Sequence, residues 1–385
     1  MLTKPFKLIL FLSIAVAAII TSCTKSDVIT DPTSTILNLP ASVFNYANIS
    51  LPVYLTTAPA LNEINTPGSN QITDNAATLG RVLFYDKNLS VNNSIACASC
   101  HKQAFGFSDS ALLSKGFAGG LTARNSMSLT NARYYPDGKF FWDERAATLE
   151  FQTLQPIQNH VEMGMILDSL VKKLSALSYY PSLFQKAFGD ASVTSDRISK
   201  ALSQFVRSII SYQSKYDDGR SSLAANQNPA AIDFPNFTAQ ENRGKQLFFS
   251  PQLACAACHG TETFTALEPK NNGLDIISTD AGVGGITNIT AQNALFKVSS
   301  LKNIELTAPF MHDGRFATLE QVVEHYNSGI KPNVNLAPEL KDPNGNPKQM
   351  NLSVADKGAL VAFLKTLTDQ KLITDEKYSN PFVVK

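Results

Sequence analysis

Apolar residues recur at helical spacing over several stretches of the chain. Residues 195–212 are predicted to form an amphipathic helix, because their apolar positions lie three or four residues apart. Residues 318–327 begin with Thr-x-x-Gln and stop before a glycine, the pattern of a helix with a capped start and a glycine exit. Residues 353–366 are a third helix candidate. Since no alternating run is long enough for a sizeable sheet, the pattern predicts a mainly α fold with long loops.

The N-terminus has the pattern of an export signal. Lys4 and Lys7 precede an apolar run over residues 8–20, after which small residues lead into Cys23. A basic start, a short apolar stretch and small residues before a cut site are typical of a signal peptide, and the run is short for a membrane span. We interpret residues 1–23 as a lipoprotein signal peptide that ends in lipidation of Cys23. The alternative is ordinary signal cleavage beside an incidental cysteine.

Residues 24–69 follow as a tether and an N-terminal extension, and their first part is rich in Ser, Thr, Asp and Pro, as flexible linkers are. The expected location is the periplasm, with a lipid anchor as the only link to a membrane. The chain of 385 residues is 44% apolar and 17% charged, and its formal net charge is +1. This balance gives no general attraction to nucleic acid, and the length suffices for two domains.

Four of the five cysteines stand in two copies of one motif. The copies read Cys97-Ala-Ser-Cys100-His101 and Cys255-Ala-Ala-Cys258-His259. C-x-x-C-H is the attachment signal for c-type haem, because the two thiols reach both vinyl groups and the adjacent histidine becomes the proximal iron ligand. Two disulfides or one four-cysteine zinc site also use four cysteines, but neither explains a histidine after each pair. The sequence therefore predicts two covalently bound haem c groups.

The two haem motifs stand in similar settings. Residues 79–85 and 243–249 precede them, and both segments are predicted to be short helices with one apolar face. An internal duplication of a cytochrome c unit explains this similarity. Residues 213–236, rich in Ser, Asn, Asp, Gly and Pro, have the composition of an interdomain linker. We therefore expect two cytochrome c-like haem domains, over residues 70–215 and 235–375.

Residues 70–370 resemble the bacterial di-haem cytochrome c peroxidases and the related enzyme MauG. The most specific stretches are Arg124-Asn125-Ser126, Phe141-Trp142-Asp143, residues 156–163 and residues 306–314. The resemblance implies that the N-terminal haem domain is peroxidatic and meets hydrogen peroxide. It also implies that the C-terminal haem domain transfers electrons.

The resemblance further implies a catalytic set. In the family an acid/base glutamate follows a tryptophan by twenty positions, with a glutamine midway, and Trp142, Gln152 and Glu162 keep that spacing. Glu162 would move a proton between the peroxide oxygens, Gln152 would position peroxide or water, and Trp142 would assist electron exchange between the haems. By residue type alone, the alternative for Glu162 is a solvated surface carboxylate. The alternative for Trp142 is a side chain that packs in the core.

Two positions depart from the ordinary peroxidases. Many relatives have a histidine that closes the peroxidatic iron in the loop before the Arg-Asn pair, and Phe117 stands there in this chain. The first haem is therefore expected to be open to peroxide without reductive activation, with His160 as the less favoured substitute ligand. Ordinary members also place a methionine ligand fourteen residues after His312, where this chain has Tyr326, as MauG has a tyrosine. A phenolate favours higher iron oxidation states than a thioether does.

Other side chains could replace Tyr326 as the distal ligand of the second haem, namely Met311, Met350 and His325. Relatives also hold a calcium ion between the haem domains through a side-chain amide and backbone carbonyls. The matching positions are Asn125, Thr307 and Pro309. For His312, a hydrogen-bonding role near the site and a structural role are equally favoured.

The predicted activity is reduction of hydrogen peroxide to water, with electrons from a small periplasmic donor such as a cytochrome or a cupredoxin. One alternative is a MauG-like oxidase that modifies a partner protein. Another is a di-haem electron carrier without turnover, which requires both irons to be closed by two protein ligands. Phe117 and Glu162 favour an enzyme over a carrier.

Overall fold

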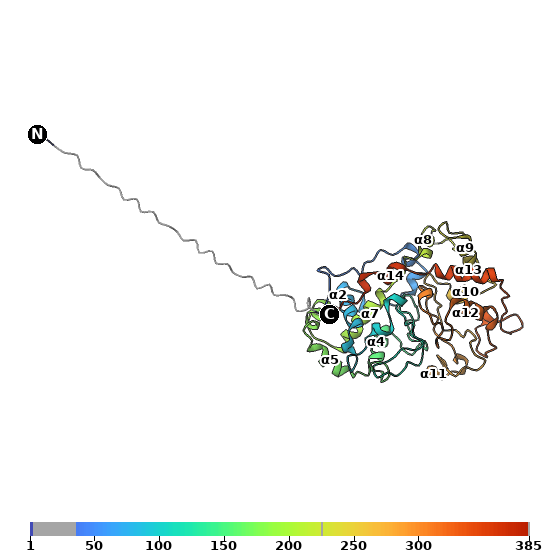
Figure 1. Ribbon diagram of the computed structural model, residues 1–385, viewed down its shortest axis with the longest axis horizontal. Helices are drawn as coiled ribbons and strands as arrows, with labels where there is room; N and C mark the ends of the chain where they lie inside the picture. The colour runs from blue at the N-terminus through green and yellow to red at the C-terminus, as the bar shows by residue number, and fades with distance from the viewer. Residues whose placement is uncertain (3–35, 225, 384–385) are drawn as a thin grey trace. The chain divides into compact units, whose positions relative to one another are not determined.

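Helices and tight turns form the described part of the protein (Figure 1). The computed structural model describes residues 1–2, 36–224 and 226–383, so Cys23 and the apolar run 8–20 lie outside the described residues. The α-helices are α1 Val53–Thr56, α2 Asp74–Tyr85, α3 Cys97–Cys100, α4 Leu149–Gln158, α5 Leu167–Ser175, α6 Tyr180–Phe188, α7 Ser195–Ser208, α8 Lys215–Ser221, α9 Ala239–Phe248, α10 Cys255–His259, α11 Gly284–Thr287, α12 Leu319–Glu324, α13 Val354–Lys365 and α14 Gln370–Thr374. The shorter turns are η2 Ala60–Glu63, η3 Gly68–Asn70, η4 Lys87–Leu89, η5 Gln103–Phe105, η6 Thr290–Gln292, η7 Ile304–Leu306, η8 His325–Gly329, η9 Pro338–Leu340 and η10 Glu376–Tyr378. Paired backbone in the described ranges consists of isolated bridges, which confirms the mainly α prediction.

The three helices predicted from apolar spacing are present. The predicted helix 195–212 is α7, which ends at Ser208 because Ile209 leaves helical geometry and its carbonyl accepts the Asn131 N–H. The predicted helix 318–327 is α12, capped by Thr318 and continued by the π-helical turn η8. The third is α13, capped by Ser353.

Two helix pairs lie in the two large hydrophobic clusters of the protein, and each pair meets at a glycine. We call the part built around α2 and α7 the first half and the part built around α9 and α13 the second half. Helix α2 packs along α7, and α9 packs along α13. A Cβ atom on Gly80 would lie 2.0 Å from the Ala201 carbonyl oxygen, and one on Gly244 would lie 1.9 Å from the Ala359 carbonyl oxygen. Glycine is therefore required at both crossings. The same close glycine contact therefore occurs in both halves.

Both ends of the part that runs from residue 36 to residue 383 pack on the first half. Leu37 is buried and forms an antiparallel bridge with Phe382, and the Tyr46 hydroxyl donates to the Lys377 carbonyl over 2.6 Å. Helix α14 contacts η5, where the Gln103 amide donates to the Leu372 carbonyl over 3.0 Å. Residues Pro32–Lys385 accordingly form one compact unit, in which packed structure begins by Leu37, within the segment predicted as tether and extension.

The segment predicted as a linker contains the short helix α8. Tyr216 is buried in the hydrophobic cluster of the second half. Asp217 forms a buried ion pair with Lys302 over 2.5 Å and accepts the Tyr54 hydroxyl over 2.7 Å. These contacts hold residues 215–221 against the rest of the unit.

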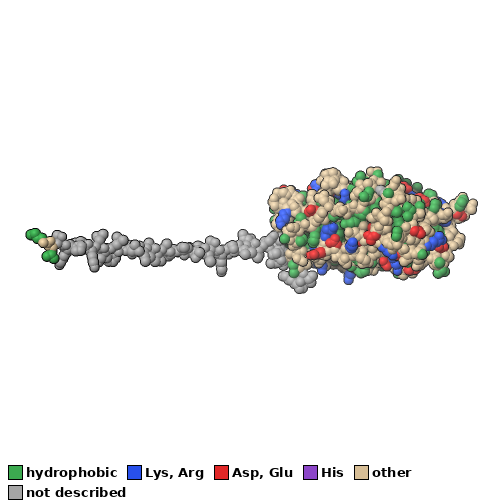
Figure 2. Space-filling model, turned by 90° about the horizontal axis from the view of Figure 1, so that it is seen from above, with side chains coloured by type: hydrophobic (Ala, Val, Ile, Leu, Met, Phe, Trp, Pro, Cys, Tyr) green, Lys and Arg blue, Asp and Glu red, His purple; other side chains and the backbone are tan. Residues whose placement is uncertain are grey.

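Basic and acidic side chains are interspersed on the face seen in Figure 2, in keeping with the net charge of +1. In the described ranges, no helix combines the length and the apolar character that a membrane span requires.

Candidate haem-binding sites

The two C-x-x-C-H segments have matching local structures. Their cysteines lie on α3 and α10, and all four thiols are free. The Nδ1 atom of His101 lies 3.0 Å from the Phe107 carbonyl oxygen, and Nδ1 of His259 lies 3.0 Å from that of Phe264. Both phenylalanines have positive φ, 60° and 58°. The backbone thus holds each ring by Nδ1 and leaves Nε2 as the nitrogen for a ligand.

Burial favours the neutral form of both histidines. It lowers the pKa of His101, although the bond to the Phe107 carbonyl opposes the shift. It also lowers the pKa of His259 to about 4, against the same kind of backbone bond. Since iron binds the neutral imidazole, both rings are prepared for a metal at neutral pH.

Each histidine opens on a cavity, and Trp142 lines both cavities. We call the cavity beside His101 the first cavity and the one beside His259 the second cavity. Other residues of the first cavity are Phe141, Arg145, Gln152, Pro156, His160 and Glu162. Other residues of the second cavity are Cys255, Cys258, Asn272, Met311, Tyr326 and Met350. Free thiols, a neutral imidazole and a cavity in each half fit one haem c per half.

The zinc alternative does not fit this arrangement. No cluster of three or more His, Cys, Asp or Glu side chains suited to a metal occurs in the part of the chain that the structure describes. The cysteine pairs also belong to separate hydrophobic clusters, around Cys97 in the first half and Cys255 in the second.

Glu162 and Gln152 both line the first cavity, Gln152 from a helix and Glu162 from the loop that follows it. Gln152 belongs to α4, and Glu162 follows the end of that helix, where its N–H donates to the Asn159 side chain over 3.2 Å. Glu162 is partly buried, and burial raises its pKa while the charge of Arg145 lowers it. No described side chain pairs with its carboxylate. A carboxylate with a raised pKa beside an open cavity is suited to proton transfer.

Phe117 stands where many relatives have a histidine ligand, and His160 is the candidate substitute ligand. Phe117 does not line the first cavity; its N–H donates to the Glu162 carbonyl over 2.9 Å and its ring packs over Gly164. His160 lies at the edge of this cavity with an exposed side chain.

A second internal repeat relates the two cavities, and the sequence analysis missed it. The pattern D-x-R-x-A-T-L-E occurs at residues 143–150 and 313–320. The residues two positions before each copy, Phe141 and Met311, have positive φ of 70° and 76°. Bridges between residues 140 and 146 and between 310 and 316 close the same turn in both halves. The shared pattern in the sequence was the signal that could have revealed this repeat.

The repeat matches Trp142 with His312 and Pro156 with Tyr326, because Pro156 follows Trp142 by fourteen residues and Tyr326 follows His312 by fourteen. Pro156 lines the first cavity and Tyr326 lines the second. A proline side chain has no atom that binds iron. The second half therefore has a phenol, Tyr326, at this position of the repeat, whereas the first half has Pro156, which cannot bind iron.

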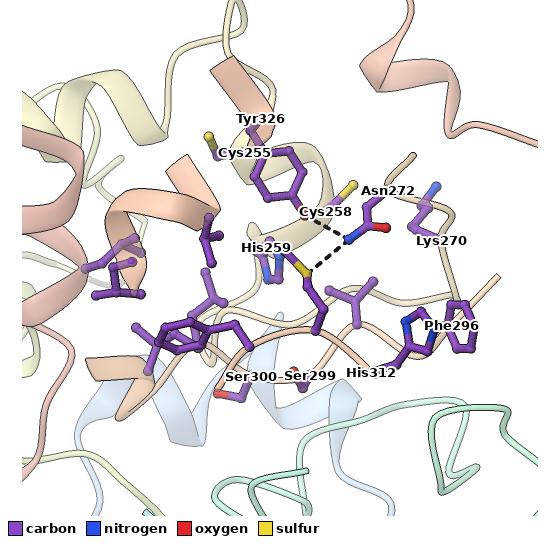
Figure 3. A pocket seen from close by; sticks show the side chains of 18 of the residues that line it. Cys255, Cys258, His259, Lys270, Asn272, Phe296, Ser299, Ser300, His312 and Tyr326 are labelled. Atoms are coloured by element: carbon purple, nitrogen blue, oxygen red, sulfur yellow. Dashed lines mark hydrogen bonds between the residues drawn. The ribbon is translucent and has the colours of Figure 1, made fainter. Parts of the chain in front are cut away.

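Tyr326 lies in η8 and points into the second cavity (Figure 3). The Asn272 side-chain amide donates to its hydroxyl over 3.5 Å and to the Met311 sulfur over 3.3 Å. Burial raises the pKa of Tyr326 to about 12, while the Asn272 bond lowers it. Met350 lines the same cavity, whereas His325 does not and bonds the Asn272 carbonyl through Nε2 over 3.0 Å.

Trp142 and His312 lie side by side between the cavities. The indole Nε1 donates to the Asn125 carbonyl over 2.8 Å, and the two rings meet edge to face with centroids 6.5 Å apart. His312 stacks on Phe296 at 3.8 Å, and burial lowers the pKa of His312. Its Nε2 is 3.9 Å from the Asp280 carboxylate.

The three positions implied for calcium lie together on the second cavity. Asn125, Thr307 and Pro309 all line it. The Asn125 amide nitrogen donates to the carbonyls of Ala111 and Leu112 over 3.2 and 3.1 Å. These bonds do not use Oδ1, the atom that a calcium ion would bind.

Comparison with known proteins identifies the family. Residues 74–222 match the family described as di-haem cytochrome c peroxidase. The methylamine utilization protein MauG of Methylorubrum extorquens is 33% identical over 304 residues, which cover 78% of this chain and 80% of that protein. The chain belongs to the di-haem cytochrome c peroxidase and MauG family. Members of this family carry two haem c groups, so the protein is a di-haem oxidoreductase.

Further relatives span both branches of the family. The cytochrome c551 peroxidase of Nitrosomonas europaea is 32% identical over 315 residues, covering 80% of this chain and 85% of that protein. A solved structure of a MauG-like protein associated with microbial copper homeostasis is 31% identical, with a TM-score of 0.73, and covers 87% of this chain and 99% of that chain. These similarities confirm the predicted family and fold, and they include both peroxidases and MauG proteins.

Proposed function

We propose that the protein reduces hydrogen peroxide to water at the first cavity. The observation that carries this proposal is Glu162, a partly buried carboxylate without a described side-chain partner, on the same cavity as Gln152. Pro156 and Phe117 support it, because neither side chain has an atom that could bind the iron of a haem held by His101. The same features oppose a plain electron carrier.

Each side chain has a role that follows from its chemistry. When bound, the two haems supply the iron at which peroxide is reduced and a store for electrons. The Glu162 carboxylate takes the proton of the inner peroxide oxygen and returns it to the outer oxygen, which then leaves as water. The Gln152 amide holds the peroxide or the product water by hydrogen bonding. Trp142 lines both cavities and lies on the route for electron exchange.

The test is an optical and EPR titration of the purified ferric holoprotein with one equivalent of peroxide. We expect a high-spin ferric signal that disappears at once, and peroxide consumption when a reduced small cytochrome or cupredoxin is added. Two low-spin haems that react only after half-reduction would contradict the open first cavity. A protein that leaves peroxide intact in both redox states would refute the proposed function.

A MauG-like oxidase of a partner protein is the second candidate, and Tyr326 is the observation that favours it. A phenolate ligand on the second haem stabilises higher oxidation states, and it is the ligand expected at that position in MauG. Under this alternative, the oxidised state formed by one equivalent of peroxide persists, and a small donor reduces it slowly. Rapid turnover with the small donor supports the peroxidase.

We further propose that the protein is exported to the periplasm and anchored through a lipid on Cys23. Mass spectrometry of the N-terminal peptide checks this, since a mature chain that starts at lipidated Cys23 is expected. Cys23→Ser should release the protein from the membrane fraction. A mature chain that starts elsewhere without lipid contradicts the anchor.

We also propose a calcium ion bound by the Asn125 side chain and the carbonyls of Thr307 and Pro309. The side-chain amide and the carbonyls supply oxygen ligands of the kind that calcium takes. Elemental analysis of the dialysed holoprotein should find one calcium per chain, and Asn125→Ala should lose it. A wild-type protein without calcium contradicts the proposal.

A further inference from the structure

A buried cluster of Tyr135, Glu144 and Lys297 lies beside the first cavity and takes no part in the chemistry described so far. The three side chains are 2%, 7% and 8% exposed. Tyr135 and Lys297 line the first cavity, whereas Glu144 lies behind them. The Tyr135 hydroxyl donates to Oε1 of Glu144 in a short hydrogen bond.

Lys297 completes the cluster. Its Nζ lies 2.6 Å from the centroid of the Tyr135 ring and donates to the Lys139 carbonyl over 2.9 Å. Its backbone N–H donates to the Trp142 carbonyl over 2.8 Å, which ties the cluster to the tryptophan between the cavities. Tyr135 thus lines the cavity, and its hydroxyl bonds the buried carboxylate of Glu144.

The pair Glu144 and Lys297 can accept one more proton. Burial raises the pKa of Glu144 and lowers that of Lys297, and their mutual attraction opposes both shifts. In the ionised form of the pair, the Glu144 carboxylate can bind the proton that leaves the Tyr135 hydroxyl, because that hydroxyl already donates to its Oε1. A proton that leaves the Tyr135 hydroxyl therefore has an acceptor within hydrogen-bond distance.

We propose that Tyr135 is a redox-active side chain that gives one electron to the first haem site during peroxide reduction. This inference rests on the proposed function, which supplies hydrogen peroxide as the oxidant. The Tyr135 O–H bond breaks, its electron goes to the oxidising equivalent left by peroxide, and its proton goes to the Glu144–Lys297 pair. The product is a neutral tyrosyl radical, which a donor electron and the returning proton convert back to Tyr135.

Other aromatic residues lack this combination of position and proton acceptor. Trp142 lines the cavity, but its Nε1–H donates to a backbone carbonyl, which is too weak a base to take the proton. Tyr134 also lines the first cavity, and its hydroxyl donates to the Leu55 carbonyl over 3.4 Å. Tyr54 and Tyr180 donate to the carboxylates of Asp217 and Asp86, yet neither lines the first or the second cavity.

The test is freeze-quench EPR of the ferric holoprotein mixed with one equivalent of peroxide in the absence of a donor. We expect an organic-radical signal that narrows when the protein carries ring-deuterated tyrosine. Tyr135→Phe should abolish this signal, and the matched control Tyr134→Phe should keep it. A tyrosyl signal of equal size in Tyr135→Phe overturns the proposal.

Two further readouts separate a redox role from a structural one. Glu144→Gln keeps a hydrogen-bond acceptor for Tyr135 but removes the proton acceptor, so the radical yield should fall at least tenfold while the ferric spectrum stays unchanged. In wild-type protein, radical formation should be slower in D2O than in H2O, because the proton moves with the electron. A yield in Glu144→Gln equal to wild type, or equal rates in both solvents, contradicts the mechanism.

The outcomes also distinguish this inference from the proposed function. If peroxide leaves the ferric haem spectrum of the wild type unchanged, the proposed function fails and the Tyr135 step fails with it. If the haem spectrum responds but no tyrosine-derived signal forms, only the Tyr135 step is refuted.

Discussion

The surroundings of Glu162 suit it to its predicted role, because a glutamate in solution is mostly ionised above a pH of about 4.3. Here partial burial raises its pKa, the charge of Arg145 limits the rise, and no described side chain pairs with the carboxylate. The group is therefore closer to the pKa that a general acid/base needs near neutral pH.

Glu162→Gln should slow the reaction of the ferric protein with peroxide by about 10²-fold to 10⁴-fold, the usual contribution of a general acid/base. Stopped-flow spectroscopy at the first haem measures this rate. Only the deprotonated carboxylate accepts a proton, so the wild-type rate should fall as the pH drops through the raised pKa of Glu162. The variant should lack this acid limb.

His160→Ala is the matched control, since His160 lies on the same cavity with an exposed side chain. Its peroxide rate and ferric spectrum should equal those of the wild type. A changed ferric spectrum in His160→Ala would instead identify His160 as an iron ligand.

Tyr326→Met tests the second cavity, because a thioether favours ferrous iron more than a phenolate does. The reduction potential of the second haem should rise by on the order of a few tenths of a volt, within the ~0.8 V that axial ligands span. A spectroelectrochemical titration measures it. Met350→Leu changes another residue of that cavity and should leave the potential near the wild-type value. A shift only in Met350→Leu would make Met350 the ligand.

At the scale of elements, two helix crossings organise the halves. Helices α2 and α7 approach at Gly80, and α9 and α13 approach at Gly244, closely enough that a Cβ atom would overlap a backbone carbonyl oxygen. Backbone atoms cannot move aside as the end of a flexible side chain can. Helix α2 contacts α3, and Cys255 of α10 packs against the hydrophobic cluster that includes residues of α9 and α13, so the crossings support the haem motifs.

Gly80→Ala and Gly244→Ala should each lower the free energy of unfolding by about 3 kcal/mol or more, the upper part of the range for overpacking. Denaturant unfolding of the holoprotein measures the change. Gly358→Ala in α13 is the control, because its Cβ would meet only the end of the Gln240 side chain at 3.4 Å. This control should raise stability by up to ~1 kcal/mol. Wild-type stability in Gly80→Ala would contradict the close crossing.

At the scale of the whole unit, Arg124 connects the two halves. Its guanidinium bonds Asp143 in the first half over 2.6 Å and Asp280 in the second half over 2.7 Å. Burial raises the pKa of Asp280, but the Arg124 hydrogen bonds outweigh this and the net pKa is lowered. A carboxylate with a lowered pKa stabilises the folded state at pH values above its unfolded-state pKa. This contribution is lost as the pH falls through the folded-state pKa.

Asp280→Asn should therefore destabilise the protein by about 1 kcal/mol at neutral pH, as expected for a partly exposed ion pair. The difference from wild type should vanish in acid, where Asp280 is protonated in both states. Thermal unfolding midpoints across a pH series measure both effects. Asp196→Asn, which breaks an exposed pair with Lys200 inside α7, should have little effect. A difference that persists in acid would point to a cause other than charge.

The sequence alone determined the features that local chemistry encodes. The two C-x-x-C-H motifs predict haem attachment because both thiols and the histidine lie within five consecutive residues. Helical apolar spacing predicted the mainly α fold and the helices α7, α12 and α13, with errors only at their ends, where tertiary contacts such as that of Ile209 decide. The family resemblance, carried by short contiguous stretches, was confirmed as well.

Only the tertiary structure decided which side chains share a cavity. Trp142 lines both cavities, and Tyr135 meets Glu144 and Lys297, although Lys297 lies more than 150 positions further along the chain. Composition could not indicate that α8 packs within the predicted linker or that Leu37 pairs with Phe382. Such contacts, like the burial that raises the pKa of Glu162, depend on how distant segments pack, which no local pattern records.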